Sequence, residues 1–156
     1  MQAGESLLIH AGASGVGTAA IQLAKHAGAK IFITAGSDEK IQRCLALGAE
    51  VGINYKTENF AERIFELTEQ KGVAVILDCV GGKYLQQNLS LLQLQGRMVL
   101  IGLLGGAKAE IDLALVLRKR LRLIGSVLRS RTLAEKTAIT RLFRVCPEIN
   151  LHGRCF

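Results

Sequence analysis

The sequence contains no tryptophan and a single proline, Pro147, and aromatic residues make up only 4% of its 156 residues. Long hydrophobic runs are missing too, because Gly, Asp or Arg interrupts the apolar stretches within a few positions. A transmembrane helix needs about 20 consecutive apolar residues, so the sequence predicts no membrane span. Residues 1–5 contain neither the basic region nor the apolar core of a signal peptide. A cytoplasmic location is therefore the default expectation.

The sequence also lacks the cysteine and histidine spacings of a metal site or a disulfide framework. Four cysteines are spread widely and form no CxxC pair (Cys44, Cys79, Cys146 and Cys155). Three histidines form no HxxxH or similar cluster (His10, His26 and His152). We therefore expect reduced thiols, with Cys44 and Cys79 buried as small apolar residues, and no zinc.

Charge is unevenly distributed in a chain whose formal net charge is +7. Much of it lies in the segment RKRLRLIGSVLRSR, residues 118–131. These cations can form a solvated edge around an apolar strand, or they can bind an anionic partner such as a nucleic acid. We favour the solvated edge, because no aromatic residue interleaves with the cations as a single-strand stacking platform requires.

What the sequence does contain is a repeated alternation of short apolar runs and helical patterns. The runs are uniformly apolar, which is typical of parallel strands covered on both faces (Leu7–Ile9, Ile31–Ile33, Val51–Ile53, Val73–Leu77, Met98–Ile101 and Leu121–Ile124). This alternation predicts an α/β fold with a parallel sheet and right-handed crossovers. With 49% hydrophobic residues and no linker, the chain suits one domain.

Segments with helical periodicity lie between the apolar runs. Residues of one face recur at helical spacing between each pair of strands (Ala20, Leu23, Ala24 and Ala27; Ile41, Cys44 and Leu45; Phe60, Ile64 and Leu67; Leu85, Leu89 and Leu92). Thr57 and Asp112 are predicted N-caps. The sequence TLAE, Thr132–Glu135, predicts a capping box before a last helix that stops ahead of Pro147.

The segment HAGASGVGTAAIQLAKHAG, residues 10–28, holds three glycines and a serine within six positions, directly after the first apolar run. A strand, a glycine-rich turn and a helix form a phosphate-binding arrangement, because backbone N–H groups and the helix N-terminus approach a pyrophosphate closely. The spacing is G-x-G-x-x-G with Ser14 at the second glycine position. In its strand-turn-helix context the motif predicts dinucleotide binding by Gly12, Ser14, Gly15, Val16 and Gly17.

The end of the second predicted strand bears on the choice of dinucleotide. An NAD site usually has an acidic residue there, about 20 residues beyond the loop, to bind the ribose 2′-hydroxyl. This chain reads TAGS at residues 34–37, and Gly36, Ser37 and Lys40 offer donors instead. NADP(H) is therefore favoured. The alternative is that Asp38 binds the ribose while Lys40 only solvates a helix.

Several segments together resemble the zinc-independent quinone oxidoreductases of the medium-chain dehydrogenase/reductase superfamily, of the zeta-crystallin-like and tumour-suppressor-inducible types. They are HAGASGVGTAAIQLAKHAGAK, TAGSDEK, INYK, ILDCVGG and LRSR, spread from about residue 4 to residue 131. The resemblance implies a three-layer Rossmann fold, a six-stranded parallel sheet of order 3-2-1-4-5-6 with helices on both faces, and NADPH as cofactor. In the intact family, hydride passes from NADPH to a quinone or enone acceptor, and no metal is needed.

The resemblance also implies cofactor contacts. By position, Lys40 and Tyr55 match contacts to the adenosine 2′-phosphate, and a second set lies along the cofactor towards the nicotinamide (Asp78, Cys79, Val80, Leu103, Leu104 and Leu128). These residues admit simpler structural interpretations. Tyr55 can cap the rim of the core, Asp78 can cap the following turn, Cys79 can be a packed thiol with no base beside it, and Asn54 can bond its own backbone.

Relatives of this type have about twice this length, because an N-terminal catalytic domain precedes their cofactor domain. We expect that catalytic domain to be absent from this sequence. We expect residues 1–145 to form the NADP-binding domain and residues 146–156 a divergent tail. No catalytic acid/base pair is visible in the sequence, so we expect cofactor binding with little or no turnover. In the superfamily the last strand pairs across a two-fold axis, which implies a homodimer, or a mixed dimer with full-length subunits, through Leu121–Val127.

Overall fold

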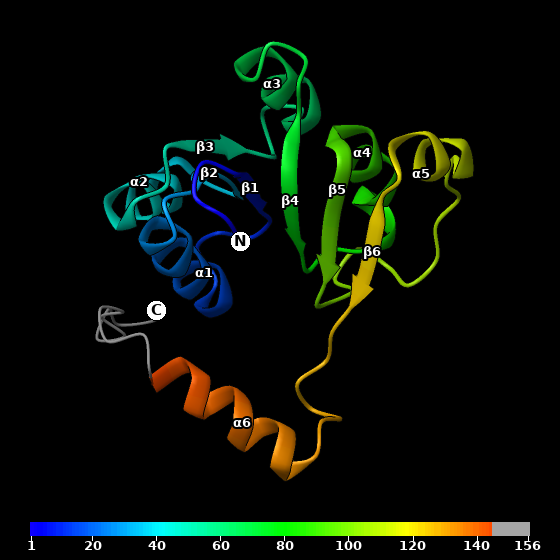
Figure 1. The fold of residues 1–156 in the computed structure, drawn as a ribbon. Coiled ribbons are helices and arrows are strands. Elements are labelled where there is room, and N and C mark those ends of the chain that lie inside the picture. The colour runs from blue at the N-terminus through cyan, green and yellow to red at the C-terminus, as the bar shows by residue number, and fades with distance from the viewer. Residues whose placement is uncertain (145–156) are drawn as a thin grey trace.

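Six parallel strands form the centre of this structure, a computed structural model that describes residues 1–144 (Figure 1). The sheet order is β3-β2-β1-β4-β5-β6, and each neighbouring pair is parallel. The strands are β1 (Ser6–Ile9), β2 (Lys30–Ala35), β3 (Val51–Asn54), β4 (Val73–Asp78), β5 (Leu92–Leu100) and β6 (Arg122–Gly125). The predicted Rossmann-type α/β fold and its strand order are confirmed.

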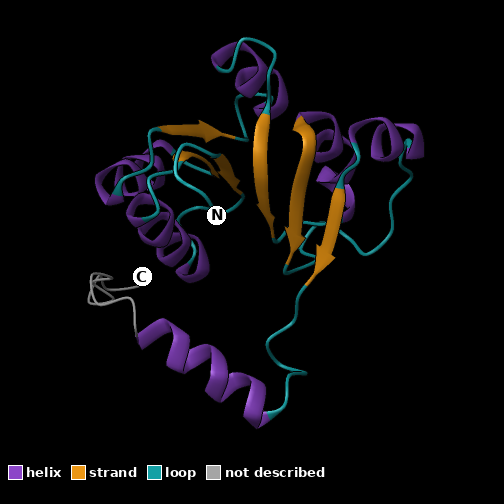
Figure 2. Ribbon diagram, viewed as in Figure 1, coloured by secondary structure: helices purple, strands orange, loops and turns teal. Residues whose placement is uncertain are grey.

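The helices follow the strands in alternation and lie on both sides of the sheet (Figure 2). They are α1 (Gly15–His26), α2 (Asp38–Leu47), α3 (Phe60–Leu67), α4 (Gly82–Leu91), α5 (Leu113–Lys119) and α6 (Leu133–Arg144). Within residues 1–144, no helix combines the length and the apolar character that crossing a membrane requires.

Alternate residues of the central strands fill two separate cores. Leu7 and Ile9 of β1 pack with the buried residues of α1 and α2, whereas Leu8 packs with those of α3 and α4. In β2, Ile33 and Phe32 divide between the two cores in the same way. Successive side chains of a strand point to opposite faces, so a strand covered on both sides must be apolar throughout. This explains the uniformly apolar runs of the sequence.

β6 departs from this pattern. All four of its residues are exposed, with Leu123 at 43% and Ile124 at 44% of their full accessibility. β5 pairs with one side of β6, and residues 1–144 supply no strand for the other side. The predicted strand is therefore present, but it is an edge strand and not one covered on both faces.

Three predicted element boundaries are corrected by the structure. Asn59, not Thr57, is the N-cap of α3, because the N–H groups of Thr57 and Glu58 bond to the carbonyl of Asn54 and form a turn there first. Leu92 leaves the helical face and starts β5, with ψ 135°. β5 thus begins earlier than predicted, because its pairing with β4 continues past an irregularity that includes Gln95 at φ +61°.

The predicted caps of the last two helices are confirmed. Asp112 accepts a hydrogen bond from the N–H of Ala114 at 2.8 Å and caps α5. Thr132 and Glu135 bond reciprocally across the start of α6, which lies apart from the sheet in Figure 1. The predictions about Pro147 and the tail at residues 146–156 lie outside the described residues.

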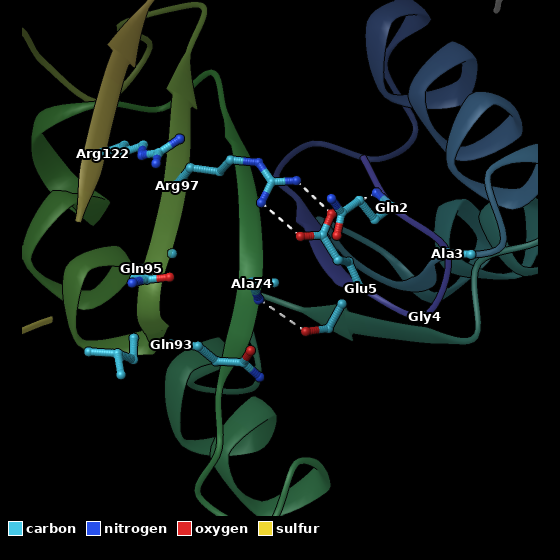
Figure 3. A pocket seen from close by; sticks show the side chains of 12 residues that line it. Gln2, Ala3, Gly4, Glu5, Ala74, Gln93, Gln95, Arg97 and Arg122 are labelled. Carbon is cyan, nitrogen blue, oxygen red and sulfur yellow. Dashed lines mark hydrogen bonds and ion pairs between the residues drawn. The ribbon is translucent and has the colours of Figure 1, made fainter. Parts of the chain in front are cut away.

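A salt bridge spans the amino ends of the strands. Arg97 of β5 binds the Glu5 carboxylate through both terminal nitrogens, at 2.8 and 2.5 Å (Figure 3). These bonds from Arg97, with a hydrogen bond from the N–H of Gln2, lower the pKa of Glu5 from 4.5 to about 2. The pair lines a pocket of about 650 Å³, which also includes Gln93 and Arg122. This pocket lies at the opposite edge of the sheet from the glycine-rich loop.

We predict that Glu5→Gln lowers the free energy of unfolding at pH 7 by about 1 kcal/mol, because a two-point ion pair is lost. The folded-state pKa of Glu5 lies below its ordinary value, so its contribution is complete above pH 4.5 and is lost as the pH falls through about 2. Urea unfolding at several pH values should show the two proteins converging in acid. Glu39→Gln, in an exposed pair on α2, is the control. Equal stability of Glu5→Gln and the unchanged protein at pH 7 would contradict this prediction.

Candidate functional site

The predicted site residues follow the carboxyl ends of the six strands, and these ends lie at one edge of a parallel sheet. The strand order reverses between β1 and β4, because β2 and β3 lie on one side of β1 while β4, β5 and β6 lie on the other. Open α/β sheets bind ligands in the crevice at such a switch point. The loop from β1 to α1 opens directly there.

Hydrogen bonds hold this loop in a tight turn. The N–H of Gly12 bonds to the carbonyl of Thr34 on β2 at 2.9 Å, and the N–H of Ser14 bonds to the carbonyl of Ala11 at 2.9 Å. The Ser14 hydroxyl oxygen accepts the N–H of Gly17 at 3.0 Å and is the N-cap of α1. Ser14 thus performs a capping role at the position where the usual motif has a glycine.

Two glycines of the loop have no room for a side chain. A Cβ on Gly17 would lie 2.5 Å from the carbonyl oxygens of both Ala11 and Gly12. A Cβ on Gly12 would lie 2.7 Å from the Cβ of Ile33. These close contacts bring the first turn of α1 directly against the end of β1, which is the packing role of the last glycine in dinucleotide-binding turns.

The donors of this loop suit an anion. Ser14, Gly15 and Val16 are exposed, and the N–H groups of a first helical turn have no acceptor within their own helix. No acidic residue lies in the first turn of α1. A helix N-terminus with free N–H groups favours negative charge, so these residues fit the pyrophosphate of a dinucleotide.

The ends of β2 and β3 meet beside this loop. The hydroxyl oxygen of Tyr55 would lie only 2.7 Å from a Cβ on Gly36, so the two residues are packed together. Ser37 caps α2 by accepting the N–H of Lys40 at 3.4 Å. Lys40 is exposed and Tyr55 is 44% exposed, which leaves both accessible to a ligand.

Asp38 and Asn54 form a second contact between these two strand ends. The side-chain amide of Asn54 donates to the Asp38 carboxylate at 2.9 Å. The amide oxygen of Asn54 accepts the N–H of Lys56 at 3.2 Å, which confirms that Asn54 bonds its own local backbone. The alternative in which Asp38 binds a ribose therefore has to compete with Asn54 for that carboxylate.

After β4, the carboxylate of Asp78 caps the next turn. Asp78 is fully buried and accepts the N–H of Val80 at 2.7 Å and the N–H of Gly81 at 3.2 Å. Cys79 donates its thiol to the carbonyl of His10 at 3.7 Å. Burial, and then the charge of Asp78, raise the pKa of this thiol, so Cys79 is a packed thiol and not an activated nucleophile.

The loop after β5 packs against the loop after β4. The N–H of Leu104 bonds to the carbonyl of Cys79 at 3.1 Å, and the N–H of Gly105 bonds to that of Val80 at 2.6 Å. The side chains of Leu103 and Leu104 are 51% and 84% exposed. Leu128 lies apart, in the segment between β6 and α6, where its carbonyl accepts the N–H of Arg131. The cofactor contacts of these residues stay predictions.

A buried polar network that the sequence did not predict lies near the carboxyl ends of the central strands. His10 is 2% exposed; its Nδ1 lies 3.1 Å from the Thr34 hydroxyl and its Nε2 lies 2.8 Å from the Asn88 amide oxygen. The amide nitrogen of Asn88 donates to Asp78 at 3.3 Å. The available signal was the position of polar residues at the ends of otherwise apolar strands.

The ring of His10 is also enclosed by aromatic side chains. The ring centroids of Phe60 and Tyr84 lie 4.9 and 5.0 Å from that of His10. This burial lowers the pKa of His10 below its ordinary value of 6.5, so the imidazole is neutral at neutral pH. A neutral imidazole has one donor and one acceptor, which matches its two partners.

Several cations of residues 118–131 are already engaged. Lys119 donates to the carbonyls of Ser90 and Leu92 at 2.6 and 2.8 Å, and Arg131 lies 3.6 Å from Glu135. The solvated edge and the nucleic-acid surface both stay predictions for this segment. Within residues 1–144, no three His, Cys, Asp or Glu side chains are grouped so as to hold a metal ion.

The fold and the loop at the switch point define a Rossmann-type domain of the dinucleotide-binding class. Zinc-binding dehydrogenase is the family that matches residues 15–144. Quinone oxidoreductase from Salmonella typhimurium is 42% identical over 115 residues, which cover 74% of this chain and 35% of that relative. Squalestatin tetraketide synthase clz2 of Cochliobolus lunatus is 45% identical over 116 residues, which cover 72% of this chain and 4% of the synthase.

A solved structure of Escherichia coli quinone oxidoreductase complexed with NADPH has a TM-score of 0.79 and 36% identity, covering 94% of this chain and 46% of that one. The chain therefore belongs to the zinc-binding dehydrogenase family, and quinone oxidoreductases are among its relatives. It spans about a third of the length of the Salmonella relative.

We predict that Gly17→Ala lowers the free energy of unfolding by about 1–3 kcal/mol, because a Cβ there forces α1 away from two carbonyl oxygens. Gly125→Ala is the matched control, since a Cβ at that exposed position meets no atom within 4 Å. Urea unfolding followed by circular dichroism measures both. A Gly17→Ala protein as stable as the control would disprove the close packing.

Proposed function

We propose that this chain is the NADPH-binding domain of a quinone oxidoreductase-type protein. The observation that carries the proposal is the glycine-rich loop from Gly12 to Gly17, which opens the N-terminus of α1, with no acidic residue in its first turn, at the switch point of the sheet. It is supported by the solved relative that is complexed with NADPH and 36% identical to this chain. Free thiols at Cys44 and Cys79 suit a cytoplasmic location, which belongs to the same proposal.

The proposed cofactor lies across the carboxyl edge of the sheet. Its pyrophosphate faces the loop between β1 and α1, and its adenosine 2′-phosphate faces the ends of β2 and β3 (Gly36, Ser37, Lys40 and Tyr55). Its nicotinamide half lies along the loops after β4 and β5 (Asp78, Cys79, Val80, Leu103 and Leu104), with Leu128 as a further contact. The donors of the first two regions match the negative charges of the two phosphate groups.

Bound NADPH supplies a hydride, which the whole protein is proposed to pass to a quinone or to an enone. Reduction of an enone is included because CurK enoyl reductase is among the solved relatives, with 36% identity to this chain. The described residues bind and orient the cofactor, and none of them is assigned to the acceptor. Turnover by residues 1–156 alone is expected to be low.

We predict that the protein binds NADPH more tightly than NADH and that Lys40→Ala raises the Kd for NADPH about fivefold, since an exposed ion pair contributes about 1 kcal/mol. The Kd for NADH should not change, because NADH has no 2′-phosphate. Calorimetry or nicotinamide fluorescence at several salt concentrations measures both values. Lys71→Ala, at the far end of β4, controls for the loss of net charge. Equal effects of Lys40→Ala on both cofactors would count against the assignment.

We further propose that β6 pairs with its copy in a homodimer. Its free edge is exposed, and unpaired strand edges promote association. The N–H of Ser126 points to β5, because it bonds to the carbonyl of Leu100 at 2.9 Å. N–H groups alternate in direction along a strand, so those of Leu123 and Gly125 point to the free edge.

We predict that Leu123→Pro makes the protein monomeric, because it removes an outward N–H and keeps the bonds between β6 and β5. Sedimentation velocity over a range of concentrations should show a dimer for the unchanged protein and a monomer for the variant. Leu117→Lys on α5, which is 77% exposed, is the surface control. A variant that dimerises as the unchanged protein does would rule out pairing through this edge.

A further inference from the structure

The function proposed above places Asp78 beside the cofactor but gives no role to the chain of hydrogen bonds Thr34–His10–Asn88–Asp78. All four residues are at most 2% exposed. We propose that they are positioning residues that couple the loop between β1 and α1, called the pyrophosphate loop below, to the loops after β4 and β5. In this way they set the affinity for the nicotinamide half of the dinucleotide. This inference rests on the proposed function, because it concerns how the same site is held together.

The direction of each bond follows from its donors and acceptors. The Asn88 amide nitrogen donates to the Asp78 carboxylate, so the amide oxygen is the atom that accepts from His10. His10 Nε2 therefore carries the proton, and its Nδ1 accepts the hydroxyl proton of Thr34. The chain is thus ordered from the Thr34 hydroxyl to the Asp78 carboxylate, and a change at one end alters the partners at the other.

At its first end, the network holds the pyrophosphate loop. The Thr34 hydroxyl oxygen accepts the N–H of Ala11 at 3.4 Å, and the Thr34 carbonyl accepts the N–H of Gly12 at 2.9 Å. Ala11 has φ +52°, a backbone conformation that non-glycine residues adopt only where their surroundings impose it. Thr34 is therefore one of the groups that keep the loop in this conformation.

At its other end, the network holds two further loops. Asp78 accepts the N–H groups of Val80 and Gly81, and it fixes the turn after β4. The carbonyl of Val80 in turn accepts the N–H of Gly105, in the loop after β5. One set of buried bonds thus connects the loops after β1, β4 and β5. Within residues 1–144, it makes no hydrogen bond to Gly36, Ser37, Lys40 or Tyr55.

This separation allows a test with two ligands. NADPH spans all three coupled loops, whereas adenosine 2′-monophosphate (2′-AMP) lacks the pyrophosphate and the nicotinamide half and faces only the ends of β2 and β3. We expect Asn88→Leu, which is nearly isosteric and breaks the chain in the middle, to raise the Kd for NADPH about tenfold. The Kd for 2′-AMP should change less than about twofold. Thr34→Val, a smaller change, should likewise raise the Kd for NADPH more than the Kd for 2′-AMP.

Leu89→Ala is the matched control. Leu89 is the neighbour of Asn88 on α4 and is fully buried without a polar contact. General destabilisation lowers the fraction of binding-competent protein, which raises the apparent Kd of both ligands by the same factor. If Asn88→Leu and Thr34→Val weaken the binding of NADPH and of 2′-AMP equally, as a destabilised protein does, the proposal is wrong.

Hydrogen exchange in the ligand-free protein separates this inference from the proposed function. Asn88→Leu should speed amide exchange at Ala11 and Gly12, on the other side of His10, and Leu89→Ala should not. Thr34→Val should in turn speed exchange at Val80 and Gly81. Changes confined to the neighbours of each substitution would overturn the coupling. If the unchanged protein binds neither ligand, the proposed function fails, and the exchange data still decide the coupling.

Discussion

The contact between the first turn of α1 and the end of β1 is the constraint on which this structure depends. Gly17 lies against two carbonyl oxygens with no space for a Cβ, and Gly12 lies equally close to β2. Because the helix starts so near the sheet, its free N–H groups open at the point where the strand order reverses. A longer or bulkier connection would move those donors away from the ends of β4 and β5.

The same constraint explains why polar groups are buried at this edge. A loop this tight places backbone N–H and carbonyl groups in the interior, where an unpaired polar group costs free energy. Thr34 and Asp78 accept hydrogen bonds from these N–H groups, and His10 and Asn88 link the two through their side chains. No buried side-chain nitrogen or oxygen among the described residues lacks a hydrogen bond. The network is therefore a consequence of the loop geometry as much as a support for it.

The elements that sequence patterns predicted are those determined by local spacing. Uniformly apolar runs gave the central strands, and the three glycines with Ser14 gave the loop, because both signals lie within a few residues. The N-cap of α3 and the start of β5 depend on how Asn54 and Gln95 turn the chain, which composition does not reveal. His10 and Asn88 lie 78 residues apart, so only the folded chain brings them together.

Asp38 and Asp78 are acidic residues near the carboxyl ends of the strands, where the proposed ligand carries negative charge. Both carboxylates already accept hydrogen bonds: Asp38 from Asn54, and Asp78 from Val80, Gly81 and Asn88. Hydrogen bonds from N–H groups place positive partial charge beside each carboxylate and reduce the field that it projects. His10 is neutral, and Lys40 remains exposed at the adenosine end. The edge therefore presents donors to a ligand although it contains acids, and its electrostatics follow from which groups are already paired.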